Sequence, residues 1–188
     1  MDLLKDIRVT KDLIKEARFL EAEIILNALP ESEKNPQAQH LLGLVALQTN
    51  RAAEAIVYFK KAAIHLPQDA YLQNNLAQAY KVLGMITEAK LAFRKSAKYE
   101  TSFAEPLNHL GLLLMQEEKK QQAETTFLSA ISRKTNYAEA HYNLAVLLEG
   151  LGRLPEALVH YRSAVKAKPD YIQAINNLGT VLDGLGKH

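Results

Sequence analysis

Small side chains recur along this chain with a period of 34 residues, and this repeat constrains the fold more than any other feature. The repeats begin at Pro36, Ala70, Ala104, Ala138 and Ile172. Position 8 is glycine or alanine, at Gly43, Ala77, Gly111, Ala145 and Gly179. Position 20 is alanine in each complete repeat, at Ala55, Ala89, Ala123 and Ala157. Small residues at two fixed positions let two helices approach closely, so the pattern predicts a row of two-helix units.

Two further positions fit the same arrangement. Position 24 is aromatic, at Phe59, Phe93, Phe127 and Tyr161. We expect these rings to fill the space between one helix pair and the next. Position 32 is proline at Pro67 and Pro169, where it cannot continue the second helix.

The starts of the first helices carry N-terminal signals. Asn35 followed by Pro36 fits an N-cap with proline at the first helical position. At three other starts a Ser, Asn or Asp precedes a Glu or Gln by three residues, which is the spacing of a capping box. These expected boxes are Ser102 with Glu105, Asn136 with Glu139, and Asp170 with Gln173.

Taken together, these positions resemble the tetratricopeptide repeat (TPR) family across nearly the whole chain. The resemblance implies an all-α, right-handed superhelix (an α-solenoid) of about five and a half helix-turn-helix repeats, as a single domain over residues 1–188. We expect a divergent, charged N-terminal capping repeat, four complete repeats and a C-terminal half repeat, over residues 2–35, 36–69, 70–103, 104–137, 138–171 and 172–188. The loop from Leu29 to Pro36 is the expected flexible connection.

In this family the first helix of each pair, helix A, lines the concave face, and its positions 2, 5, 6, 9, 12 and 13 point into the groove. Asparagine recurs at positions 5 and 6, and this row resembles the asparagine ladder in the TPR region of O-GlcNAc transferase. An amide both donates and accepts, so one amide per repeat could hold the backbone of an extended peptide. The candidate peptide-binding residues are Asn74, Asn75, Gln78, Asn108, His109, Leu112, Tyr142, Asn143, Val146, Asn176 and Asn177.

An alternative use of the amides stays open, because they could bond within the helix packing or simply face solvent. Leu41 and His109 interrupt the row at position 6. The chaperone-binding members of the family hold a peptide's terminal carboxylates with lysine and arginine at fixed groove positions. No register of this sequence supplies those basic residues. We therefore expect no binding of peptide tails ending in EEVD.

The residue types present argue against chemistry in this chain. There is no cysteine, and the histidines form neither an i,i+4 pair nor an HExxH motif, so no catalytic residue, metal site or cofactor is expected. His40, His109 and His141 lie on first helices and could face the groove, although a lone histidine on such a helix is usually a surface or packing residue. The net charge of +2 lacks the basic excess of a nucleic-acid binder. No stretch approaches a membrane span and no signal peptide is recognisable, so the cytoplasm is the expected location.

The sequence favours a scaffold that binds a protein or peptide, and it leaves two alternatives open. The repeats could be the substrate-recognition region of a larger enzyme, such as a glycosyltransferase or sulfotransferase, because the last repeat is incomplete. They could also self-assemble through the apolar C-terminal edge. This edge consists of Ile175, Leu178, Val181, Leu182 and Leu185.

Overall fold

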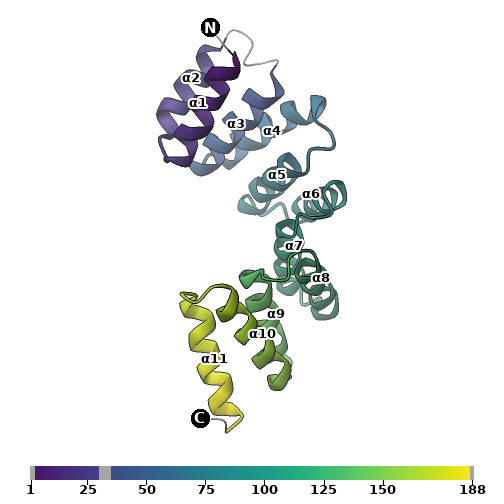
Figure 1. Ribbon diagram of the computed structural model, residues 1–188. Coiled ribbons are helices and arrows are strands. Elements are labelled where there is room, and N and C mark those ends of the chain that lie inside the picture. Colours follow the sequence, from purple (N-terminus) through teal and green to yellow (C-terminus); the bar gives the residue numbers. More distant parts are fainter. Residues whose placement is uncertain (1–2, 30–34, 187–188) are drawn as a thin grey trace. The chain divides into compact units, whose positions relative to one another are not determined.

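The computed structural model describes residues 3–29 and 35–186, and within these ranges every regular element is an α-helix (Figure 1). The helices are α1 (Leu3–Lys15), α2 (Phe19–Ala28), α3 (Pro36–Gln48), α4 (Ala52–His65), α5 (Ala70–Val82), α6 (Ile86–Tyr99), α7 (Glu105–Gln116), α8 (Lys120–Arg133), α9 (Ala138–Gly150), α10 (Leu154–Ala167) and α11 (Ile172–Gly184). Residues 30–34 of the predicted flexible loop and residues 187–188 of the predicted C-terminal half repeat lie outside the described residues.

The chain divides into two compact units, unit 1 ending at Tyr99 and unit 2 starting at Glu100. In unit 1 the helices pack as the pairs α1–α2, α3–α4 and α5–α6, and in unit 2 as α7–α8 and α9–α10, with α11 against α10. Within a unit the second helix of one pair also packs on the first helix of the next, and neighbouring first helices touch. This confirms the predicted all-α TPR solenoid, whereas the single-domain organisation stays a prediction.

The predicted close-packing positions form the core of each pair. The alanines at position 20 and the rings at position 24 are fully buried. A Cβ atom placed on Gly111 would lie 2.5 Å from the Phe127 ring, and one on Gly43 would likewise collide with Phe59. These rings therefore fill space inside their own pair, not only between neighbouring pairs as expected from the sequence.

The turn between the two helices of a pair uses a left-handed backbone at position 15. Glycine supplies it at Gly84, Gly152 and Gly186, with φ of 71°, 73° and 63°. Other residues adopt it at Ala17, Asn50 and Glu118, with φ of 58°, 61° and 57°. After Ala17, Asn50, Gly84, Glu118 and Gly152 the next N–H bonds to a carbonyl five residues earlier, as Lys119 does to Leu114 at 2.9 Å. This is the hydrogen bond of a Schellman motif, which favours glycine at the left-handed residue.

Only one of the predicted helix caps forms. The Asn35 side chain accepts hydrogen bonds from the N–H groups of Gln37 and Ala38, as expected. The prediction of three capping boxes is wrong. The N-cap residues of α7, α9 and α11 are Ala104, Tyr137 and Tyr171, and none of them makes a side-chain cap hydrogen bond.

The Ser102 hydroxyl, which was expected to cap α7, donates to the Glu100 carboxylate at 2.7 Å instead. A cap that the sequence patterns did not single out is Asp69, which accepts from the Leu72 N–H at 2.9 Å. The side chain before a helix therefore caps it only where the turn aims that side chain at the helix.

Arginine at position 16 ties neighbouring pairs together in each unit. Arg51 binds Glu23 of the preceding pair at 2.7 Å. Arg153 does the same to Glu124 at 2.8 Å and also binds Glu156 of its own helix at 2.6 Å. Because the acceptors Glu23 and Glu124 are only 22% and 13% exposed, these ion pairs are better shielded from water than ordinary surface pairs.

The last helix, α11, differs from the other first helices. Nothing lies within 4 Å of a Cβ placed on Gly179, and Ile175 is 43% exposed. Val181, in contrast, is only 2% exposed. The predicted self-assembly edge is therefore wrong in including Val181, because that side chain is already packed within the unit.

Candidate functional site

Two of the candidate amides bridge neighbouring first helices. In unit 1 the Asn75 amide nitrogen lies 2.9 Å from His40 Nε2. In unit 2 the Asn143 amide donates to Asn108 Oδ1 at 2.8 Å. In both pairs a residue at position 6 reaches position 5 of the preceding repeat. These contacts favour the alternative in which the amides bond within the helix packing, and they fix the register of adjacent first helices.

A third amide joins a chain of polar groups in unit 2. The Asn177 amide donates to the Tyr161 hydroxyl at 3.1 Å, and that hydroxyl donates to Glu149 at 2.5 Å. Burial, followed by the Glu149 hydrogen bond, raises the pKa of Tyr161, so the phenol stays protonated at all ordinary pH values. The Glu149 carboxylate is therefore held in place by a permanent donor.

The remaining candidate residues differ in how much of their surface a ligand could reach. Asn74 and Asn108 are each 4% exposed, so their side chains belong to the interior. Asn176 lies exposed on α11. The others are half-buried along the first helices, namely Gln78, His109, Leu112, Tyr142 and Val146. A peptide could reach this half-buried set more readily than the buried amides.

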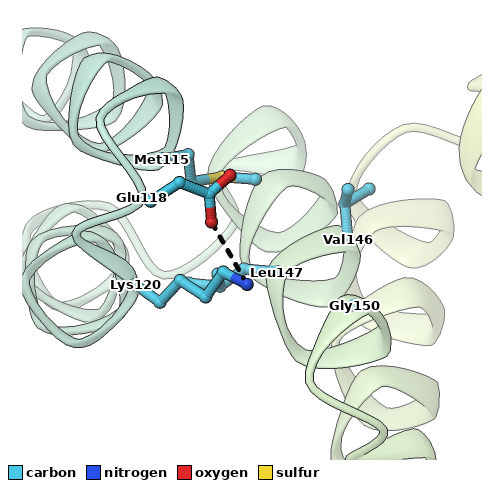
Figure 2. A pocket seen from close by; sticks show the side chains of 6 residues that line it. All are labelled: Met115, Glu118, Lys120, Val146, Leu147 and Gly150. Carbon is cyan, nitrogen blue, oxygen red and sulfur yellow. Dashed lines mark ion pairs between the residues drawn. The ribbon is translucent and has the colours of Figure 1, made fainter.

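A cleft of about 130 Å³ lies between α7 and α9 of unit 2, on the face formed by the groove positions of the first helices (Figure 2). Met115 and Val146 line it from groove positions 12 and 9, together with Leu147 and the open backbone at Gly150. An ion pair of 3.2 Å between the Glu118 and Lys120 side chains closes one side of it, as the dashed line in Figure 2 shows. The cleft offers apolar surface with charged groups beside it.

The groove positions of the two units carry different charges. Those of α7, α9 and α11 hold carboxylates and no lysine or arginine, the carboxylates being Glu105, Glu139, Glu149 and Asp183. Those of α3 and α5 hold no carboxylate and one lysine, Lys81. These groove positions of unit 2 also include the histidine His109, whose Nε2 atom lies 3.6 Å from the Glu105 carboxylate. The first-helix face of unit 2 is therefore acidic, although the chain as a whole is slightly basic.

Tyrosine rings lie beside these carboxylates. Tyr142 packs between Tyr161 and Tyr171, with ring centroids 6.0 Å and 5.0 Å away. Burial, and then the nearby charge of Glu139, raises the pKa of Tyr171. The Lys168 ammonium sits 5.2 Å from the centroid of the Tyr171 ring. The cluster thus already holds one cation over an aromatic face, in a field made negative by Glu139.

A histidine pair that sequence reasoning missed lies within the α9–α10 pair. His141 and His160 approach through their Nδ1 atoms at 3.0 Å, and His141 Nε2 lies 3.0 Å from the Thr135 carbonyl. The carbonyl can only accept, so His141 carries its proton on Nε2 and His160 donates from Nδ1. Burial, followed by the charge of His141, lowers the pKa of His160. The expectation of a packing role is met, although the two residues act together.

No group of three metal-binding side chains occurs among residues 3–29 and 35–186. Over the same ranges no helix has the length and apolarity that a membrane crossing requires. The first-helix face of unit 2 presents a cleft, carboxylates and tyrosine rings.

Comparisons with known proteins place the chain among the helical repeat proteins. The tetratricopeptide repeat family matches residues 36–63, 70–102 and 108–172, and the chain belongs to that family. The chain is also similar to the TPR repeat-containing protein PA4299 of Pseudomonas aeruginosa, with 32% identity over 94 residues. That match spans 50% of this chain and 38% of the relative, so the chain corresponds to well under half of the relative's length.

Solved structures show the same fold at low sequence identity. The chain is similar to pilF of Pseudomonas aeruginosa with a TM-score of 0.87 and 18% identity, over 97% of this chain and 84% of that one. It is similar to YrrB, described as a TPR protein with an unusual peptide-binding site, with a TM-score of 0.71 and 19% identity, over 94% and 91% of the two chains. These likenesses show the TPR fold, and membership of the TPR family makes the chain a protein-interaction scaffold.

Proposed function

We propose that this scaffold binds an extended polypeptide on the first-helix face. The observation that carries the proposal is the cleft between α7 and α9, which presents Met115 and Val146 from two adjacent first helices. Side chains at groove positions that are already half-buried lose little further freedom when a ligand covers them. Likeness in fold to YrrB, for which a peptide-binding site is described, is consistent with this role.

We propose different tasks for the candidate residues, based on their contacts. Asn75 and Asn143 hold neighbouring helices in register, and Asn177 orients the Tyr161 hydroxyl. In unit 2, ligand contact falls instead to other half-buried residues, with Leu112 and Val146 supplying apolar surface and His109 supplying a polar group. Gln78 is a half-buried polar candidate of unit 1. Removal of the bridging amides should therefore lower stability as well as binding.

A selection from a display library of random short peptides tests the proposal. Peptides enriched on the wild-type chain should lose binding at least tenfold to Val146→Asp, which places a charge in the cleft. Val159→Asp is the matched control, because Val159 is 60% exposed on α10 of the same pair. The control should bind like the wild type. Equal binding by all three proteins, or loss with the control alone, would place the ligand elsewhere.

Two other roles remain as predictions. The chain could act as the substrate-recognition region of a larger enzyme, or it could self-assemble through Ile175, Leu178, Leu182 and Leu185. Expression with any flanking coding sequence tests the first, and light scattering over a range of concentrations tests the second. A mass that stays that of one chain at every concentration would exclude self-assembly.

A further inference from the structure

We infer that the first-helix face of unit 2 selects a peptide segment that carries lysine or arginine next to an apolar residue. The inference rests on the proposed function and narrows it to one class of ligand and one unit. The face is defined by the groove positions of α7, α9 and α11, and its occupant is a basic, extended segment of a partner protein.

Charge complementarity identifies the occupant. Glu105, Glu139, Glu149 and Asp183 stand at groove positions of this face, which hold no lysine or arginine. Glu149 is fixed by the Tyr161 hydroxyl, and Glu139 is exposed in the first turn of α9. An acidic segment would meet these carboxylates with like charge, whereas a basic segment would be attracted to them before contact.

The apolar and aromatic surfaces give the basic segment places to dock. The cleft beside Met115 and Val146 suits one aliphatic side chain. Tyr142 and Tyr171 lie close together near Glu139, and cations bind over tyrosine faces. Lys168 occupies such a position over Tyr171, so a basic group of the ligand would replace this lysine there or lie beside Tyr142.

The lysines near the face do not cancel its charge. Lys120 pairs with Glu118 at the edge of the cleft, and Lys134 and Lys168 lie over Tyr137 and Tyr171, at 5.0 Å and 5.2 Å from the ring centroids. All three lysines belong to second helices or their flanking turns, so the groove positions themselves stay acidic. In unit 1 the groove positions of α3 and α5 offer the opposite case, since they hold Lys81 and no carboxylate. Selection for basic peptides should therefore depend on unit 2.

Fluorescence anisotropy with three labelled peptides tests this inference on the full chain. The first peptide carries lysines spaced around two leucines, the second has glutamate in place of each lysine, and the third has serine there. At about 50 mM salt the lysine peptide should bind at least about tenfold more tightly than the glutamate peptide. At about 300 mM salt that advantage should shrink, because screening shortens the range of the carboxylate field.

Charge reversal locates the effect. Glu139→Lys should weaken binding of the lysine peptide by about tenfold, since it replaces an attractive charge on the face with a repulsive one. Glu88→Lys makes the same change in net charge on α6 of unit 1, where Glu88 is exposed on a second helix, and should change binding less than twofold. Circular dichroism confirms that both variants fold.

Each outcome decides the matter. Equal binding of the lysine and glutamate peptides, or equal loss with Glu139→Lys and Glu88→Lys, overturns the inference. If the serine or glutamate peptide binds as tightly as the lysine peptide and Val146→Asp abolishes that binding, the proposed function stands and only the selectivity for basic peptides fails. If the peptides enriched from the library also bind without dependence on Val146, both proposals fail together.

Discussion

Replacing Gly111 by alanine tests the packing on which the repeat depends, and Gly179 provides its matched control. Both glycines occupy position 8 of a first helix in unit 2. A Cβ on Gly111 would lie 2.5 Å from the Phe127 ring, whereas a Cβ on Gly179 would have nothing within 4 Å. The two substitutions thus make the same chemical change in a filled and in an open environment.

The magnitudes follow from two opposing effects. Alanine is favoured over glycine in a helix interior by about 1 kcal/mol. Gly179→Ala should therefore raise the free energy of unfolding by roughly 0.5–1 kcal/mol. Gly111→Ala gains the same preference but forces the Phe127 ring to move, which costs about 1–3 kcal/mol in a packed core. Gly111→Ala should thus be less stable than Gly179→Ala by about 1–3 kcal/mol.

Urea denaturation followed by circular dichroism measures both variants under identical conditions. Gly111→Ala combined with Phe127→Leu provides an internal check, because the smaller side chain vacates the space that the new methyl group needs. The double variant should lose less stability than the sum of the two single losses. If Gly111→Ala stabilises the chain as much as Gly179→Ala does, the close approach at position 8 is not what limits side-chain size there.

Three further predictions concern the turns, the ion pairs and pH. Glu118→Gly should stabilise the chain by about 0.5–1 kcal/mol, because Glu118 has φ of 57°, which glycine adopts without a steric penalty. Gly84→Ala should destabilise the chain by about 1 kcal/mol, because alanine would have to adopt the left-handed backbone of Gly84. Thermal unfolding compares the two variants with the wild type. A double-mutant cycle on Glu124 and Arg153 should give a coupling of about 0.5–1 kcal/mol that falls with added salt; zero coupling at low salt would contradict the role of this pair. Burial lowers the pKa of His160 below its ordinary 6.5, so the unfolded chain binds that proton more tightly. Stability should be full above pH 6.5 and fall as pH drops toward the lower folded pKa, and urea titrations of His160→Gln should show a shallower fall.

The sequence pattern predicts the core of the fold because the same residue types recur at the same positions. Ala55, Ala89, Ala123 and Ala157 share one spacing and one fully buried environment. A close approach between helices tolerates few side chains there, so chemistry and position are tightly linked. Several independent columns with one period therefore leave little freedom in the choice of architecture.

Helix caps were harder to predict because the backbone decides which side chain can reach the helix. Asn136 and Asp170 have the residue types of N-caps, yet Tyr137 and Tyr171 occupy the cap positions of α9 and α11. The turns before these helices place the polar side chain one residue too early. Asp69 stands directly before α5 and does cap it. Residue type alone therefore misplaced these caps by one residue, although the predicted repeat starts at Ala138 and Ile172 coincide with the helix starts.

The roles of the amides and histidines depend on contacts between helices. Asn143 reaches Asn108 only because adjacent first helices pack in one particular register. His141 and His160 are 19 residues apart and meet because positions 4 and 23 face each other within a pair. The Arg153–Glu124 pair has a spacing of 29 residues, and the similar spacing between Arg51 and Glu23 is a signal that a search for recurring opposite charges would find.

The most direct test of the account is to map, by nuclear magnetic resonance, where a library-selected peptide contacts the folded chain. If the first-helix face of unit 2 is the docking surface, the amide signals that shift on titration will belong to α7, α9 and α11, with Val146 and Tyr142 among the most affected. Signals on the exposed side of α8 and α10 should stay in place. Shifts concentrated on those second helices, with Val146 and Tyr142 unchanged, would contradict the assignment of the first-helix face as the docking surface.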